Sequence, residues 1–431
     1  MARAKARNYT NYPEYEGRRE EVIEWLLNEG HAYCALPYTH MAIEANGDIK
    51  PCCVGKEFKG LNIRNKTIGE VLNDPQRQKF IDVFDKNMKS SLCNTCWKDN
   101  NAHSMRVKAS TRFDVIEDTI DAMNGNTQRN RTLKWLEIKP GNRCNLKCRI
   151  CGVHNSSQWT KEEYQHSLDQ GLTDKKFKDS REFEYTSSCD WIDDGSFWND
   201  IKSFKDIGMI HFMGGEPFMV LEHFIMLEKI IQDKSLDHSN ITIRYNTNGT
   251  YMPTKEQINI LKKFNRIILS VSVDDIGERF EYQRHPAKWD DVRKNLIDYK
   301  KLSNGTDRFD VVLDPCVSVF NIWWVDEIEK EFNNLGYEFK FPQRHFAHGK
   351  HDARLLPKEI KNKLIKKYKN KSIWKNNVAD FLSSQNKVNR NELKNMFETI
   401  EFFDKSRNES FKKINNALYN ELKKYSNGII T

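Results

Sequence analysis

The stretch Lys139–Gly152 reads KPGNRCNLKCRICG and carries three cysteines within eight residues, Cys144, Cys148 and Cys151. A tetrahedral zinc site needs a fourth ligand, and the nearest candidate, His154, follows the last cysteine too closely for a zinc finger. An iron–sulfur cubane bound by three thiolates keeps one iron with an open coordination position. That iron can bind a substrate or a cofactor. We therefore interpret this stretch as a candidate iron–sulfur loop with an open ligand position.

Short apolar segments alternate with amphipathic helical segments from Leu133 onward. Such alternation predicts a parallel sheet with right-handed crossovers. The expected strands are residues 133–138, 207–213, 241–246, 266–273, 309–319 and 337–341. These units predict an α/β fold of the partial (β/α)6 barrel type, and the cysteine stretch directly follows the first strand. Because active sites of parallel α/β sheets gather at the carboxyl ends of the strands, we expect the chemistry there.

The chain divides into regions of different composition. Residues 1–103 form an N-terminal region with five of the ten cysteines, and residues 104–132 form a helix and a linker. Residues 133–347 form the barrel, and residues 348–431 form a C-terminal helical region. The interval 155–205 is long for one crossover, so we expect additional helices within it.

The composition of the 431-residue chain, with 38% hydrophobic residues, is that of a soluble protein. No stretch reaches the roughly 18 apolar residues that span a bilayer, and the basic start lacks the apolar run of a signal peptide. We expect a cytoplasmic protein without a membrane partner, whose cysteines stay reduced and serve metal binding, catalysis or packing. The net charge of +8 is spread along the chain, so a solvated lysine-rich surface explains it and we do not expect a nucleic-acid partner.

A glycine-rich segment follows the second expected strand. Residues 213–217 read MGGEP and contain Gly214, Gly215, Glu216 and Pro217. Two adjacent glycines allow the backbone to approach a ligand closely. The exposed carbonyls and the Glu216 carboxylate can accept hydrogen bonds from an ammonium group. A plain tight turn would not require the glutamate, so we interpret the segment as a binding loop.

Polar residues also follow the third and fourth expected strands. The first segment, residues 245–250, reads YNTNGT, and its two asparagines alternate onto one face of the strand. The second, residues 269–275, reads LSVSVDD and is followed by FEYQRHP, residues 280–286. An arginine can bind a carboxylate through charge-assisted, bidentate hydrogen bonds. The candidate binding residues in these segments are Asn246, Asn248, Ser272, Asp274 and Arg284.

The CxxxCxxC spacing and the three polar segments, in this order at successive strand ends, resemble the radical S-adenosylmethionine (SAM) superfamily. The resemblance implies that the three barrel cysteines bind a 4Fe–4S cluster whose open iron chelates SAM. Reductive cleavage of SAM then yields a 5′-deoxyadenosyl radical that abstracts hydrogen from a substrate. Glu216 would accept from the SAM ammonium group, and Ser272 and Arg284 would bind its ribose and carboxylate segments. One departure is Ile150, where the family usually has an aromatic residue before the last cysteine.

The N-terminal cysteines form a second candidate cluster site. Cys34 precedes Gly47 by a spacer of twelve residues, Cys52 follows that glycine, and Cys93 and Cys96 are separated by two residues. This pattern resembles the first half of the SPASM motif, a shortened version of which is called a twitch domain. The resemblance implies one auxiliary 4Fe–4S cluster with four protein thiolates, although the family usually places this module after the barrel. A zinc ribbon is the alternative, because paired cysteines also suit zinc.

The resemblance implies a radical SAM enzyme with two 4Fe–4S clusters and SAM as cofactors. Its substrate would be a peptide or a small molecule, and its electron donor a protein such as flavodoxin or ferredoxin. Electron transfer is the simpler role for an auxiliary cluster whose irons all have protein ligands. Two alternatives come from other classes, a zinc-containing nucleic-acid-binding protein and a non-enzymatic iron–sulfur electron carrier. Both leave the MGGEP segment and Arg284 without a purpose.

Overall fold

A twisted sheet holds the expected site together in the computed structural model. The structure describes residues 16–97, 104–112, 115–126, 132–178, 180, 183, 185, 191–192, 196–233, 236–306, 308–339, 345–384 and 390–425. Among these residues the sheet has seven strands in the order β2-β1-β3-β4-β5-β6-β7. The strands are β1 (His40–Ile43), β2 (Ile49–Lys50), β3 (Trp135–Ile138), β4 (Met209–Phe212), β5 (Thr242–Thr247), β6 (Arg266–Val271) and β7 (Phe309–Leu313).

The parallel part of the sheet includes a strand from the N-terminal region. β3 to β7 pair in parallel with one another, and each overlaps an expected strand. β1 pairs in parallel with β3, with His40 opposite Trp135 and Ile43 opposite Ile138, and β2 pairs antiparallel with β1. The boundary placed near residue 103 therefore separates segments whose strands share one sheet.

The α/β fold with a parallel sheet is confirmed, but the strand expected at residues 337–341 is not found as such. Its described part, residues 337–339, forms no ladder, and residues 340–341 lie outside the described ranges. β1 supplies a further parallel strand at the opposite edge. Sequence alternation could not reveal this arrangement, because the pairing of β1 with β3 joins segments about ninety residues apart.

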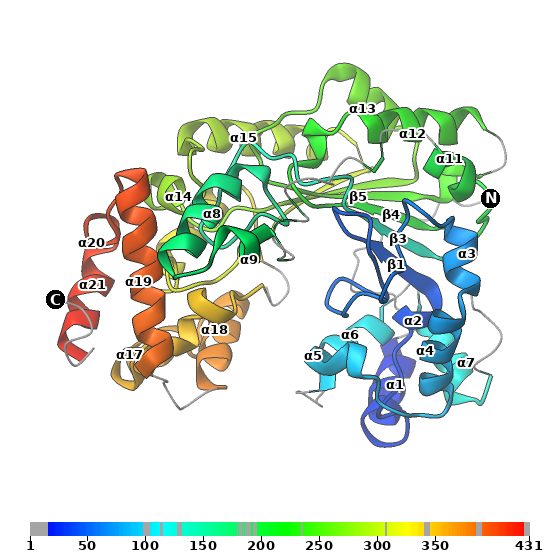
Figure 1. The fold of residues 1–431 in the computed structure, drawn as a ribbon, viewed down its shortest axis with the longest axis horizontal. Coiled ribbons are helices and arrows are strands. Elements are labelled where there is room, and N and C mark those ends of the chain that lie inside the picture. Colours follow the sequence, from blue (N-terminus) through cyan, green and yellow to red (C-terminus); the bar gives the residue numbers. More distant parts are fainter. Residues whose placement is uncertain are drawn as a thin grey trace.

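The two faces of the sheet differ in polarity. Ile243, Tyr245 and Leu269 are fully buried on the face that packs against helices. Figure 1 shows α12, α13 and α15 lying along this face. The helices that follow the strands are α12 (Glu222–Gln232), α13 (Lys255–Leu261), α14 (Gly277–Gln283), α15 (Trp289–Asn304) and α16 (Val325–Asn334). The opposite face carries charged and polar side chains, which is unusual because parallel sheets are normally covered by apolar packing on both faces.

The N-terminal region is helical around β1 and β2. Its helices are α1 (Glu16–Asn28), α2 (Leu36–Thr39), α3 (Ile68–Asn73), α4 (Pro75–Asp85) and α5 (Asn94–Trp97). The long helix expected after residue 104 is two helices, α6 (Met105–Ser110) and α7 (Ile116–Met123). The buried guanidinium of Arg106 donates to the carbonyls of Leu26, Gly30 and Tyr33 at 2.9–3.1 Å, so α6 holds the end of α1. Of the expected linker, residues 127–131 lie outside the described ranges.

The inserted and C-terminal segments are helical, as expected. The insertion contains α8 (Thr160–Asp169), α9 (Asp174–Lys178) and α11 (Ser196–Ile201), and the C-terminal region contains α17 (Lys358–Tyr368), α18 (Ile373–Ser383), α19 (Arg390–Arg407), α20 (Phe411–Ile414) and α21 (Asn416–Tyr425). Short 3-10 helices occur at Ser91–Cys93 (η2), Ser157–Trp159 (η3), Pro217–Met219 (η4), His238–Asn240 (η5), Gly349–His351 (η6) and Ala353–Leu355 (η7). Among the described residues, no helix is long and apolar enough to cross a membrane.

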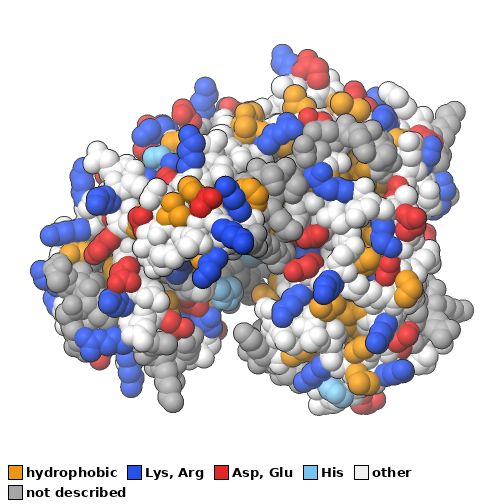
Figure 2. All heavy atoms as spheres, viewed as in Figure 1, with side chains coloured by type: hydrophobic (Ala, Val, Ile, Leu, Met, Phe, Trp, Pro, Cys, Tyr) orange, Lys and Arg blue, Asp and Glu red, His pale blue; other side chains and the backbone are white. Residues whose placement is uncertain are grey.

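The N-terminal and C-terminal helices both lie below the sheet, at its two opposite ends. Figure 1 shows α1 to α7 below one end of the sheet and α17 to α21 below the other end. Figure 2 shows a hollow between these two parts of the molecule.

Candidate active site at the strand ends

The three-cysteine loop leaves β3 and is held in place by hydrogen bonds to several elements. Asn142 donates its side-chain amide to the carbonyls of Val153 and Tyr185, both at 2.8 Å. The backbone amides of Lys147 and Arg149 donate to the carbonyls of His285 and Gln283, each at 2.8 Å. The loop is therefore fixed against the end of α14, and the three cysteines lie at the carboxyl end of β3, as expected.

The thiols of this loop are buried among hydrogen-bond donors. Cys144 and Cys148 are buried, and Cys151 is half-buried. The Sγ atom of Cys144 accepts from the backbone amide of Leu146 at 3.4 Å and from the side-chain amide of Asn248 at 3.8 Å. Burial and the neighbouring Cys148 raise the pKa of Cys144 to about 12, so cluster assembly must displace its proton. Three thiols with nearby N–H donors suit an iron–sulfur cluster, because thiolates bind its irons and hydrogen bonds tune them.

Cys148 and Cys151 interact directly. The hydrogen bond from the Cys151 thiol, followed by the charge of Arg284, lowers the pKa of Cys148. The same hydrogen bond and burial raise the pKa of Cys151. The Nη1 atom of Arg284 lies 3.9 Å from the Cys148 Sγ atom. A cation beside these thiols would offset part of the negative charge of bound thiolates.

The MGGEP segment packs directly against the cysteine loop. Gly215 has a φ of +56°, and a Cβ atom there would lie 2.2 Å from the carbonyl oxygen of Arg143. The Glu216 amide donates to the same carbonyl at 2.8 Å. Gly214 has a φ of +80° and lies against the side chain of Lys139. The glycines thus bring the end of β4 into contact with the loop, and Pro217 begins η4.

Gly215→Ala is expected to destabilise the protein. The left-handed backbone costs an alanine about 1–2 kcal/mol, and the clash with the Arg143 carbonyl adds about 1–3 kcal/mol. Gly60→Ala is the matched control, because Gly60 also has a positive φ, +74°, but has open space at its Cβ position. Denaturant unfolding of both variants measures the difference. Equal losses of stability in the two variants would contradict close packing at Gly215.

The Glu216 carboxylate is held by donors from two neighbouring segments. Its side chain is fully buried, and its carboxylate accepts from the Phe218 amide at 3.3 Å, the Thr247 hydroxyl at 2.9 Å and the Asn248 amide at 2.7 Å. Burial raises its pKa to about 7, although these donors oppose the shift. The carboxylate therefore joins η4 to the end of β5.

The two asparagines at the end of β5 have different partners. The side-chain amide of Asn248 donates to Asn145 Oδ1 at 2.9 Å, in addition to its contact with Cys144, so it lies directly against the cysteine loop. Asn246 is half-buried, and its Oδ1 atom lies 3.1 Å from Nε2 of His211. Ser272 is half-buried, and its amide donates to the Thr247 carbonyl at 2.8 Å. Asn248 is thus the asparagine that the structure brings to the cysteines.

Asp274 and Arg284 form a buried ion pair beside Cys148. The Nε atom of Arg284 lies 2.8 Å from Oδ2 of Asp274, and Oδ1 of Asp274 accepts from the Cys316 amide at 2.8 Å. Burial acts to lower the pKa of Arg284, but the charges of Asp274 and Cys148 raise it overall. Arg284 is therefore charged. It forms an ion pair with Asp274 and also contacts Cys148 of the cysteine loop.

The polar face of the sheet contains residues that the sequence analysis did not select. Glu137 is buried, and its Oε2 atom lies 3.7 Å from Nε2 of His40 and 3.8 Å from Nδ1 of His211. Burial alone would raise the pKa of Glu137, but the two imidazoles hold it at about 2. On the next strands, Arg244 donates to Ser270 at 3.0 Å. These positions could have been found, since charged residues inside short apolar strands depart from the pattern of a buried parallel sheet.

The four N-terminal candidates come from separate elements. Cys34 precedes α2, Cys52 follows β2, Cys93 ends η2 and Cys96 lies in α5. Burial, and then the neighbouring Cys34 thiol, raises the pKa of Cys52 to about 12. Burial together with Cys34, Cys52 and Cys96 raises the pKa of Cys93. The four thiols therefore lie near enough to interact, whereas the adjacent Cys53 is exposed.

A single metal ion would need a tighter arrangement than a cluster. Within the described ranges, no three His, Cys, Asp or Glu side chains converge on one ion. A cubane does not need such convergence, because its ligands bind different irons. The auxiliary site is linked to the polar sheet face, because Nδ1 of His40 lies 3.0 Å from the carbonyl oxygen of Pro51, the residue before Cys52.

Two family models match this chain. Residues 138–314 match the radical SAM superfamily, and residues 34–97 match the iron–sulfur cluster-binding SPASM domain. These ranges contain the two groups of cysteines described above. They favour an enzyme over the nucleic-acid-binding protein and the simple electron carrier considered from the sequence.

Comparison with solved structures finds distant similarity. Native anSMEcpe with bound AdoMet is 21% identical with a TM-score of 0.35, over 48% of this chain and 50% of that one. Native anSMEcpe with bound AdoMet and Kp18Cys peptide is 18% identical with a TM-score of 0.36, over 54% and 60%. The chain thus spans about half the length of the first of these structures. No curated protein matches it.

Proposed function

Since this chain is a radical SAM enzyme with an iron–sulfur cluster-binding SPASM domain before its radical SAM domain, we propose that Cys144, Cys148 and Cys151 bind the cluster that activates SAM. The observation that carries the proposal is the convergence of the cysteine loop, the MGGEP segment and Arg284 at the ends of β3, β4 and β6. When bound, a 4Fe–4S cluster and SAM supply a carbon radical that abstracts hydrogen from a substrate. The role of the protein is to hold these groups and the substrate in place and to exclude water.

Each candidate residue has a distinct task in this proposal. Arg284, kept charged by Asp274, is placed to bind the SAM carboxylate beside Cys148. The carbonyls of Gly214 and Gly215 accept from the SAM ammonium group, and Ser272 is available to its ribose. Asn248 orients the cysteine loop through Cys144 and Asn145. Glu216 acts through Asn248, because its carboxylate accepts from the Asn248 backbone amide and so fixes that residue beside the cysteine loop.

The polar sheet face is the proposed substrate surface. Glu137, His211 and Arg244 lie on neighbouring strands, with Glu137 opposite His211 and His211 opposite Arg244 in the register. A face with an anionic glutamate and a cationic arginine on either side of a histidine suits a polar substrate, either a peptide or a small molecule. Figure 2 shows a hollow between the N-terminal and C-terminal parts of the molecule, and we propose that a substrate approaches this face from there.

The N-terminal cysteines Cys34, Cys52, Cys93 and Cys96 are proposed to bind one auxiliary 4Fe–4S cluster, which would bring the total to two. With four thiolates its irons have no open position, so we assign it to electron transfer. The contacts from Pro51 through His40 to Glu137 support the proposal that this cluster lies near the substrate surface. An electron donor such as flavodoxin or ferredoxin would reduce the barrel cluster.

Anaerobic reconstitution tests the proposal. The purified chain is expected to bind about eight irons, two cubanes, and to form 5′-deoxyadenosine from SAM when reduced with dithionite. Iron, sulfide and zinc analysis together with chromatography of the products gives the measurement. Stoichiometric zinc without iron uptake would refute the proposed function.

A further inference from the structure

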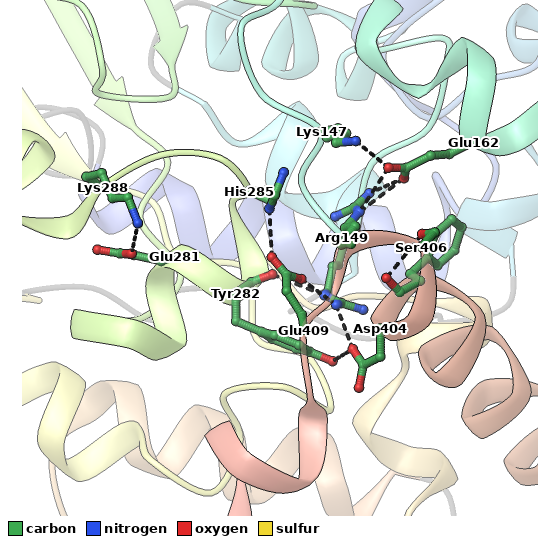
Figure 3. A network of polar contacts seen from close by, with 12 residues as sticks. Lys147, Arg149, Glu162, Glu281, Tyr282, His285, Lys288, Asp404, Ser406 and Glu409 are labelled. Carbon is green, nitrogen blue, oxygen red and sulfur yellow. Dashed lines mark hydrogen bonds and ion pairs between the residues drawn. The ribbon is translucent and has the colours of Figure 1, made fainter.

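The turn between Cys148 and Cys151 contains a buried arginine whose charge is balanced by the C-terminal region. Arg149 is 1% exposed. Its Nη2 atom lies 2.7 Å from Oδ1 of Asp404 and 2.6 Å from Oε2 of Glu409. Asp404 belongs to α19 and Glu409 to the turn that follows it, and Figure 3 shows both carboxylates directed at Arg149. The two acids are 255 and 260 positions away from Arg149 in the sequence.

The same two acids also hold the segment that carries Arg284. The hydroxyl of Tyr282 donates to Oδ1 of Asp404 at 2.8 Å, and Nδ1 of His285 lies 2.6 Å from Oε1 of Glu409. The Arg149 guanidinium lies 3.7 Å from the centre of the Tyr282 ring. Asp404 and Glu409 therefore bridge the cysteine turn to the residues on either side of Arg284.

A second contact from α19 reaches the residue before Cys148. The guanidinium of Arg407, also at the end of α19, lies 2.7 Å from Oε2 of Glu162 in α8. The other oxygen of that carboxylate contacts Nζ of Lys147. Lys147 and Arg149 flank Cys148, and both take part in ion-pair networks that include residues of α19, as Figure 3 shows.

Such buried pairs add little net stability, because desolvation offsets most of the attraction, but they select one geometry. Apolar contacts already dock α19, since the rings of Trp159 and Phe403 meet at 4.9 Å. The acids act on the loop rather than on the docking of the helix. We propose that Asp404 and Glu409 are positioning residues, which hold the Cys148–Cys151 turn and the Arg284 segment in the arrangement that binds the cluster and SAM. Only the part of this inference that concerns the cluster and SAM rests on the proposed function. The part that concerns the position of the turn does not.

Thiol reactivity in the metal-free, full-length chain tests the contact directly. In the variant Asp404→Asn with Glu409→Gln, iodoacetamide is expected to alkylate Cys148 and Cys151 at least about tenfold faster, because losing a charged hydrogen bond in a buried site frees the turn. Cys34 and Cys52 serve as internal references and should keep their rates. Glu401→Gln is the matched control, since Glu401 is an exposed acid on the same helix. Mass spectrometry of peptides gives the rate at each cysteine.

The reconstituted enzyme gives a second readout. The apparent KM for SAM is expected to rise at least about fivefold in the double variant, with a smaller change in kcat, and Glu409→Asp should recover part of the loss. Unchanged rates at Cys148 and Cys151 would overturn the proposal. A parallel rise at all measured cysteines would overturn it too, because it would indicate general destabilisation. If the wild-type chain fails to cleave SAM, the proposed function fails, while the alkylation result still decides whether α19 holds the turn.

Discussion

Replacing Cys144, Cys148 and Cys151 together with alanine is expected to abolish SAM cleavage while about four irons per chain remain bound. The three thiols lie on one loop between β3 and η3, and Asn248, Leu146 and Arg284 surround them. The N-terminal cysteines belong to other elements, before α2, after β2, in η2 and in α5, so their cluster should assemble as before. Iron and sulfide analysis and 5′-deoxyadenosine detection, both under anaerobic conditions, provide the measurement.

The control for this variant is Cys316→Ala. Cys316 is half-buried and its backbone amide donates to Asp274, so its thiol is not needed for that contact. The control should keep both the iron content and SAM cleavage, within about twofold of the wild type. Full iron content in the triple variant would show that the barrel cysteines do not bind a cluster. Residual SAM cleavage would show that another site activates SAM.

Local patterns predicted the barrel strands well because each strand is a short apolar run between polar segments. The segments 133–138 and 266–273 contain β3 and β6, and the cysteine loop lies where strand order placed it. β1 was missed, since the segment His40–Ile43 has only four residues and is a strand because it pairs with β3. A contact between distant segments leaves no periodicity in either of them.

The sequence also could not predict which partners a buried acidic side chain contacts. The sequence indicated a binding loop at Glu216 but not the protein partners of its carboxylate, which is buried and accepts from three donors. The C-terminal region was expected to be helical, but its sequence did not indicate that Asp404 reaches a buried arginine in the cysteine turn. In the sequence, an acidic residue on a charged helix that will pair with a buried cation cannot be distinguished from one that faces solvent.

Replacing Cys93 and Cys96 with alanine is expected to remove one cluster but leave SAM cleavage within about twofold of the wild type. Cys93 ends η2 and Cys96 lies in α5, away from the loop that carries Cys144. The reduced variant should therefore show the signal of one cluster in electron paramagnetic resonance and still form 5′-deoxyadenosine. Conversion of a substrate should be lost if the auxiliary cluster, as proposed, takes part in electron transfer after hydrogen abstraction.

Cys53→Ala is the matched control, since Cys53 adjoins Cys52, is exposed, and should leave both clusters intact. Folding is the main concern in the double variant, because β1 belongs to the same sheet as β3 and cluster binding can drive folding of the thiolate-bearing region. A thermal melt must show that the barrel transition is retained. If a folded variant loses SAM cleavage as well, electrons enter through the auxiliary cluster, and its assignment as an acceptor is wrong.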